Sequence, residues 1–348
     1  MPAVKNKIKF GFSVPIFAHP GVLFFRTPAY KKLDWKSIEN TVSLSEKLGY
    51  DSLFIADHLF LGNQGEIWEC IATMSALSAK TSRMEISPIH LCDSFRHPSV
   101  VAKTLATLSH ISNGRTILFY DYGWRKSEFD SYGLSFEKND KERIKKMSEG
   151  LTIIQGLLKE KKFSFKGKYY HVKDAICNPK PVKKIPIWMG ETNNSFMVKE
   201  IVAHADVFNS TPCSPEAYKK KLDILRKECK RQGRNFNTLG LSLETQVLVR
   251  KSKKEIEKSL KDYKKLLRYN NSFDKDKFDE IKKESPELSR GSLDVLKKEF
   301  LIGTPEEVKR QLGQFVKLGI SHFMLWFMDY PNTESLMLFA KKVIPYYK

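Results

Sequence analysis

The sharpest candidate for chemistry is Asp57-His58, a carboxylate and an imidazole that follow a short apolar segment. An imidazole can give or take a proton near neutral pH, and a nearby carboxylate stabilises its protonated form. We therefore predict that His58 and Asp57 are catalytic, with His58 as the acid/base or anion-stabilising group. The alternative is a loop histidine that caps a helix or packs beneath a loop.

Three further segments place residues suited to ligand binding after apolar runs. Glycine lets a backbone approach a ligand closely, and a strand-to-helix junction can hold a phosphate through backbone N–H groups. Taken singly, each segment is also compatible with an ordinary turn. The candidate binding residues are His90, Leu91, Cys92 and Asp93; Gly123 and Trp124; and Gly190, Glu191 and Thr192.

These candidates become neighbours if the apolar runs before them are parallel strands of one barrel. Predicted strands cover 8–14, 51–56, 84–91, 116–120, 185–189, 206–209, 239–249 and 321–327. Predicted helices cover 35–48, 67–79, 98–111, 140–158, 195–204, 215–232, 304–318 and 333–344. Eight such strand–helix pairs close into a (β/α)8 TIM barrel, an α/β fold whose active site lies at the carboxyl ends of the strands. No GxGxxG follows the first strand, which disfavours an open doubly wound sheet.

The barrel is predicted to be a single domain over residues 1–348. Local signals fix several helix ends: Gly233 stops one helix, and Thr304 and Glu307 form a capping box at the start of another. The block 251–300 breaks the alternation and is predicted to be a charged, helical, peripheral insertion. Residues 163–172 are expected to form a small hairpin. His110, His204 and His322 lie among apolar residues and are expected to pack in the core.

Composition narrows the class of protein. Of 348 residues, 41% are hydrophobic and 12% aromatic, which supports a large core and argues against disorder. No apolar run is long enough to span a membrane, and no signal peptide is evident. The five cysteines are scattered and odd in number, which indicates reduced thiols in a cytoplasmic protein. Cysteines and histidines lack zinc-ligand spacing, so no metal site is expected.

The net charge of +20 raises the question of an anionic partner. The most lopsided stretch, 159–184, holds nine lysines against Glu160 and Asp174. No RNA-binding, zinc-finger or helix-turn-helix signature accompanies it, so a polyanionic small molecule fits as well as nucleic acid.

An ordered series of short motifs resembles the luciferase-like family of flavin and deazaflavin oxidoreductases. The series runs through almost the whole chain and is weakest over 251–300. The motifs are 48–52 (LGYDS), 55–59 (IADHL), 95–103 (FRHPSVVAK), 112–115 (SNGR), 123–124 (GW), 128–129 (EF), 165–170 (FKGKYY), 179–181 (PKP), 186–190 (PIWMG) and 303–308 (GTPEEV). The sequence of 303–308, together with GISHF at 319–323, resembles the F420-dependent branch of the family.

The resemblance implies the barrel, a homodimer, and coenzyme F420 at the barrel mouth, with FMN as the alternative cofactor. It implies hydride transfer to or from a small organic substrate, with residues 90–93 along one face of the cofactor ring. Gly123, Trp124, Gly190, Glu191 and Thr192 would surround its side chain and phosphate. It also implies a bulge over 89–92, where F420-dependent members often have a non-prolyl cis peptide. A basic rim from the lysine-rich stretch would aid an anionic cofactor.

Two departures from the family pattern leave other functions open. Residues 119–124 read FYDYGW where the family has small residues, and Glu191 follows Gly190 where the family has glycines and a basic residue. One alternative is a two-component monooxygenase that takes reduced FMN from a partner reductase. The other is a degenerate barrel that binds an anionic ligand, or nucleic acid, without turnover.

Overall fold

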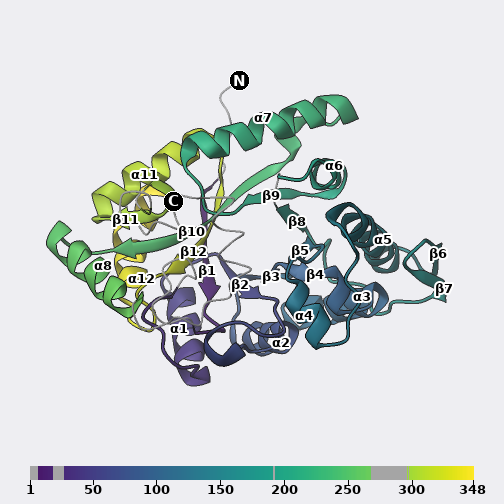
Figure 1. The fold of residues 1–348 in the computed structure, drawn as a ribbon, viewed down its shortest axis with the longest axis horizontal. Coiled ribbons are helices and arrows are strands. Elements are labelled where there is room, and N and C mark those ends of the chain that lie inside the picture. Colours follow the sequence, from purple (N-terminus) through teal and green to yellow (C-terminus); the bar gives the residue numbers. More distant parts are fainter. Residues whose placement is uncertain (1–6, 19–26, 191–192, 268–295, 297) are drawn as a thin grey trace.

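The computed structural model describes residues 7–18, 27–190, 193–267, 296 and 298–348. Parallel strands run in the order β3-β2-β1-β12-β10-β9-β8-β5-β4, and helices surround them (Figure 1). The strands are β1 (Lys9–Val14), β2 (Ser52–Ala56), β3 (Glu85–Ile89), β4 (Leu91–Cys92), β5 (Leu118–Asp121), β8 (Ile187–Gly190), β9 (Val207–Ser210), β10 (Gly240–Val249) and β12 (His322–Phe327).

The strand order closes into a barrel, because β3 and β4 are two parts of a single interrupted strand. β3 pairs with β2, β4 pairs with β5, and a parallel bridge joins Ile86 to Thr116. The break falls at His90, and the Ile89–His90 peptide bond is cis. The predicted (β/α)8 barrel and the predicted irregularity over 89–92 are both confirmed.

The outer layer follows the predicted alternation, with additions. Its helices are α1 (Trp35–Lys47), α2 (Cys70–Lys80), α3 (Pro98–Ile111), α5 (Asp140–Lys159), α6 (Ser195–His204), α7 (Pro215–Gln232), α11 (Pro305–Lys317), α12 (Glu334–Lys342) and α13 (Ile344–Tyr347). The predicted hairpin consists of β6 (Phe163–Lys166) and β7 (His171–Ala175). Two elements were not predicted: α4 (Lys126–Ser131) and β11 (Leu301–Gly303), which pairs with β10. Short 3-10 turns occupy Asn63–Gly65, Asp93–Phe95 and Phe236–Thr238.

Local sequence signals set most helix ends. Thr304 and Glu307 form the predicted capping box of α11, and Gly233 ends α7 in the left-handed region at φ 72°. The start of α2 was predicted at residue 67 but lies at Cys70. Ile67 instead forms an antiparallel bridge with Phe17, so the helix can begin only after Glu69, whose side chain caps it.

Part of the predicted insertion is described, as α8 (Lys253–Leu267). Its buried side chains Ile256, Leu260 and Tyr263 form a small second core with residues that include Leu248 and Phe300. The described part of 251–300 contributes no strand to the barrel. Residues 268–295 and 297 lie outside the described residues, so the peripheral character of the whole block stays a prediction. None of the described helices is both long and apolar enough to cross a membrane.

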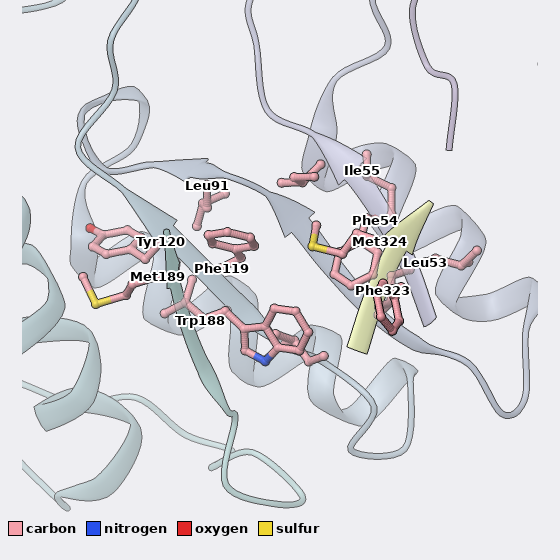
Figure 2. Close-up of a cluster of buried hydrophobic side chains, with 14 of the residues drawn as sticks. Leu53, Phe54, Ile55, Leu91, Phe119, Tyr120, Trp188, Met189, Phe323 and Met324 are labelled. Atoms are coloured by element: carbon pink, nitrogen blue, oxygen red, sulfur yellow. The ribbon is translucent and has the colours of Figure 1, made fainter. Parts of the chain in front are cut away.

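The lower barrel interior is filled by aromatic side chains. Phe54, Phe119 and Trp188 come from β2, β5 and β8 and meet inside the strands (Figure 2). The ring of Trp188 lies 5.7 Å from Phe54 and 6.1 Å from Phe119. This layer closes the barrel beneath its carboxyl end, so a ligand must bind above it.

His322 sits within this layer, as predicted for a core histidine. Its ring lies 4.9 Å from Trp188, and its Nε2 is 2.7 Å from the hydroxyl of Ser52. The same prediction was wrong for His110, which is exposed on α3, and only partly correct for His204, which is half-buried and close to Glu200. Apolar neighbours in sequence did not show which helix face these two residues occupy.

We predict that His322 makes the protein sensitive to acid. Burial, with a smaller contribution from Lys9, lowers the pKa of His322 to about 3. In the unfolded chain the His322 imidazole is protonated below about pH 6.5, whereas in the folded chain it stays neutral down to about pH 3. The free energy of unfolding should therefore fall by about 1.4 kcal/mol per pH unit across that window. The free energy of unfolding, measured with urea from pH 7 to pH 4, should depend less on pH for His322→Gln than for wild type. Parallel curves would contradict this, and His110→Gln is the exposed control.

Candidate functional site

Most of the predicted site residues lie on one arc of the barrel mouth. β2, β3 with β4, β5 and β8 are successive neighbours, so their parallel carboxyl ends open on the same side. This arc brings together His58, His90, Gly123 and Gly190. Glu191 and Thr192 lie outside the described residues, and their predicted binding role stays a prediction.

His58 is oriented by a carboxylate from a distant part of the chain. Its Nδ1 lies 2.9 Å and 3.1 Å from the two carboxylate oxygens of Glu128 on α4. Glu128 is buried and also accepts hydrogen bonds from the N–H groups of Leu59 and Phe60. The ring of Trp124 meets His58 edge-on at 5.8 Å. With Nδ1 engaged, proton transfer at this ring falls to Nε2.

The carboxylate that faces His58 is thus Glu128 and not its sequence neighbour Asp57. Asp57 is buried and forms a two-pronged ion pair with Arg96, with both N–O distances 2.8 Å. It also accepts a hydrogen bond from the Cys92 N–H at 2.9 Å. Burial alone would lower the pKa of Arg96, but Asp57 and Glu69 outweigh it and raise that pKa. Asp57 therefore anchors β4 beside the site.

His90 projects from the break between β3 and β4. Its Nδ1 is 3.2 Å from the Asp121 carboxylate, and its ring lies 4.1 Å from that of Phe119. Its Nε2 is buried without a hydrogen-bond partner. Burial raises the pKa of Asp121, but hydrogen bonds from His90 and from two backbone N–H groups outweigh burial and lower it. This arrangement leaves one imidazole nitrogen available to a ligand.

The other predicted residues of the bulge point elsewhere. Leu91 belongs to the buried hydrophobic cluster in Figure 2. Asp93 is fully buried and accepts hydrogen bonds from the hydroxyls of Tyr120 at 2.5 Å and Tyr170 at 2.8 Å. It thereby ties the hairpin to the barrel, and burial raises its pKa. Of residues 90–93, only His90 presents an unpaired polar atom.

Gly123 allows the chain to turn tightly over the bulge. Its φ is +74°, and a Cβ there would lie 2.6 Å from the Cys92 sulfur and 2.9 Å from the Phe129 ring. Burial raises the pKa of the Cys92 thiol, which fits a packing role. Gly190 is also close to its neighbours, since a Cβ would lie 3.2 Å from the Asn209 carbonyl oxygen. Both glycines keep the backbone at the mouth in close contact.

Gly123→Ala is expected to destabilise the protein more than Gly133→Ala. Both glycines have positive φ, but a Cβ at Gly133 meets nothing within 4 Å. Gly133→Ala therefore measures the backbone cost of about 1 kcal/mol for a residue with positive φ. The additional loss of stability in Gly123→Ala measures the clash of its Cβ with Cys92 and Phe129. We expect at least about 1 kcal/mol of additional loss for Gly123→Ala in urea unfolding. Equal losses would show that Cys92 and Phe129 move aside freely.

Two lysines at the end of the lysine-rich stretch lie on the side of the barrel opposite the mouth. Lys184 pairs with Asp206, just before β9, and Lys183 packs on Gly114, in the turn before β5. Both contacts are at the amino ends of the strands, opposite the candidate site. Lys168 at the hairpin tip pairs with Glu142. The basic-rim expectation is therefore wrong for Lys183 and Lys184. In the described part of the chain, no group of three or more potential metal ligands comes together.

Comparison with known proteins agrees with the barrel fold. The chain matches the family model described as luciferase-like monooxygenase over residues 13–322. An F420-dependent glucose-6-phosphate dehydrogenase from Microbacterium testaceum (strain StLB037) is 25% identical, over 87% of this chain and 90% of the relative. An FMNH(2)-dependent dimethylsulfone monooxygenase from Pseudomonas fluorescens (strain Pf0-1) is 22% identical, over 98% and 94%.

A solved structure gives the same fold. An F420-dependent secondary alcohol dehydrogenase, in complex with an F420-acetone adduct, superimposes with a TM-score of 0.76 at 17% identity. The match covers 98% of this chain and 99% of that chain. At this identity the likeness concerns the fold.

Proposed function

The chain belongs to the luciferase-like monooxygenase family, and from this premise we propose that it is an oxidoreductase that binds F420 at the barrel mouth. The observation that carries the proposal is the pair of oriented imidazoles, His58 and His90, on adjacent strand positions of one arc. When bound, F420 supplies a hydride acceptor or donor for a small organic substrate. The F420-dependent relatives support this choice of cofactor.

The residues present fit such a ring. Nε2 of His90 is buried and unpaired, so it can hydrogen-bond a polar edge of the cofactor. Gly123 and Gly190 hold the backbone at the arc where a side chain would intrude. Helix α6 begins at Ser195 with no acidic residue in its first turn, so its N–H groups can receive a phosphate. Glu191 and Thr192 would complete that end of the site.

We assign the acid/base role to His58 through Nε2. Glu128 fixes the orientation of the ring, because its buried carboxylate lies against Nδ1. Asp57 acts as a positioning residue, since its carboxylate is committed to Arg96 and to the backbone of Cys92. Trp124 packs against His58 and covers it on one side.

FMN is the second candidate cofactor. The FMNH(2)-dependent relative spans 98% of this chain, and Phe17 beside Trp326 contributes aromatic lining that suits a dry oxygenation pocket. In that case a partner reductase would deliver reduced FMN. A third candidate is a degenerate barrel that binds an anionic ligand without turnover, because Glu191 departs from the family pattern in the cofactor loop.

We also propose that the enzyme is a cytoplasmic homodimer. Its five thiols are unpaired and buried, as suits a reducing compartment. Val100 and Ile111 on α3 are 57% and 45% exposed, and Trp68 ahead of α2 is also exposed. This apolar face supports an interface with a second copy. Sedimentation equilibrium should give twice the mass of one chain, and a monomer would contradict the proposal.

Fluorescence titration with F420, and separately with FMN, tests the cofactor assignment. The proposal predicts tighter binding of F420 than of FMN. Tighter binding of FMN would instead support the two-component monooxygenase. Binding of neither cofactor would overturn the oxidoreductase proposal and leave the degenerate barrel.

A further inference from the structure

The opposite arc of the barrel mouth carries a separate set of polar side chains. It consists of the neighbouring strands β1, β12, β10 and β9, none of which holds a cofactor residue proposed above. Ser13, Asn209, Glu244 and Gln246 lie on these strands and are all at least 98% buried. Buried polar groups are costly in a barrel interior that aromatic and aliphatic residues could fill.

Contacts place these side chains inside the barrel. The outward face of β1 and β12 is defined by Phe10 and Phe327, which pack against Phe339 of α12. Because side chains alternate along a strand, Ser13 and Trp326 point inward. Trp326 donates a hydrogen bond from Nε1 to Glu244 at 2.8 Å, which places Glu244 inside as well.

The same reasoning applies to the two amides. Gln246 is two residues beyond Glu244 and in register with Trp326, so it shares the inward face. Asn209 accepts a hydrogen bond from the inward hydroxyl of Ser242 at 2.6 Å. Its strand β9 is next to β10, so the amides belong to one continuous wall.

Apart from Glu244, each side chain of this wall has a buried polar atom with no hydrogen-bond partner. These atoms are Ser13 Oγ, Asn209 Nδ2 and Gln246 Oε1. A buried polar atom without a partner costs about 1–3 kcal/mol, and native structures rarely leave several together without a ligand or water. The set contains one donor, one acceptor and one hydroxyl that can be either.

The wall also lacks positive charge. The carboxyl halves of β1, β9, β10 and β12, which the structure describes in full, contain no lysine or arginine. Arg250, just after β10, is committed to Asp329 at 2.9 Å and Ser335 at 2.7 Å. Lys221 contacts Ser210, on the outward face of β9. Glu244 instead adds a carboxylate, which would repel an anion.

We propose that this wall binds the substrate, and that the substrate is a neutral molecule with hydroxyl or carbonyl groups, not a phosphate ester. The inference rests on the proposed function, because it places the substrate across the mouth from the cofactor arc. Gln246 accepts from a substrate hydroxyl, Asn209 donates to a substrate oxygen, and Ser13 does either. The chain would then differ in substrate class from the glucose-6-phosphate dehydrogenases that it resembles.

Substrate preference tests the inference on protein loaded with F420. The panel is glucose, glucose 6-phosphate and 2-propanol, and turnover is followed by the change in F420 absorbance. We expect turnover of a neutral member and a lower kcat/KM for glucose 6-phosphate. Preference for the phosphate ester, or no turnover of either neutral member, would overturn the inference. Failure of F420 to bind at all would instead count against the proposed function.

Gln246→Leu provides a readout that a structural role would not give. Losing one neutral hydrogen bond should raise KM for the neutral substrate about tenfold while F420 affinity stays unchanged. The melting temperature should stay the same or rise, since the free protein loses an unpaired polar atom. In the control Gln311→Leu, the Oε1 atom is likewise buried without a partner, but the change also removes the hydrogen bond that the amide donates to the Ile302 carbonyl, so it should lower the melting temperature and leave KM unchanged. A lower melting temperature for Gln246→Leu, or an unchanged KM, would overturn the inference.

Discussion

Replacing His58 with alanine is expected to lower kcat by about 10²–10⁴-fold, the usual contribution of a positioned acid/base group. The affinity for F420 should fall much less, because His90 and the backbone around Gly123 and Gly190 remain. Steady-state kinetics, corrected for the folded fraction by circular dichroism, give kcat. Fluorescence titration gives the cofactor affinity independently.

Two further variants separate chemistry from folding. Glu128→Gln keeps the shape of the side chain beside His58 but replaces one of the two carboxylate oxygens that hold Nδ1 with an amide, so kcat should fall. His110→Ala removes an exposed histidine that contacts the Lys180 carbonyl oxygen, and its kcat should be unchanged. If kcat is unchanged in His58→Ala, the acid/base group is His90 or a bound water, or no catalytic role can be assigned to this site.

Replacing Arg96 with methionine is expected to destabilise the protein by about 3–5 kcal/mol. The change leaves the Asp57 carboxylate buried without the guanidinium that now holds both of its oxygens. Because Asp57 also holds the Cys92 N–H, F420 affinity should fall as β4 loosens. Urea unfolding at pH 7 measures the loss of stability.

The control for this variant is Glu69→Gln, which removes the other carboxylate on Arg96. The Glu69 side chain is 49% exposed, so its loss should cost less than about 1 kcal/mol. The double variant Asp57→Asn with Arg96→Met should recover part of the stability lost in Arg96→Met alone, because no buried charge is left unpaired. A loss below 1 kcal/mol for Arg96→Met would mean that Asp57 finds solvent or another partner.

The barrel could be predicted from the sequence because its signals are local. Gly233 and the Thr304–Glu307 capping box end or start helices through atoms within a few residues, and the structure has both. The start of α2 could not be predicted in this way. It depends on Ile67 meeting Phe17, 50 residues earlier, in a short bridge that no local pattern encodes.

The site was predicted as a set of segments but not as a set of contacts. Asp57 and His58 are neighbours in the chain, yet successive side chains of extended backbone point to opposite sides. Asp57 therefore meets Arg96, whereas His58 meets Glu128, 70 residues away. Glu128-Phe129 was part of the family resemblance, but its role depends on α4, which was not predicted.

The polar wall opposite the cofactor arc could not be predicted from the sequence. Ser13, Asn209 and Gln246 lie within predicted strands, and their inward orientation depends on strand register. For the lysine-rich stretch, 159–184, the sequence signal was strong but the predicted position at the barrel mouth was wrong for two of its lysines. Its charge is obvious in the sequence, but Lys183 and Lys184 lie at the amino ends of the strands.

Hydrogen–deuterium exchange with and without F420 tests the central claim most directly, because it reports both binding and its location. The account predicts slower exchange on adding F420 in 57–60, 89–93, 122–124 and 193–197, which together form the cofactor arc. Exchange in the hairpin and the lysine-rich stretch, 159–184, should not change. Protection confined to that stretch, or no protection anywhere at saturating F420, would contradict an F420 site at the barrel mouth.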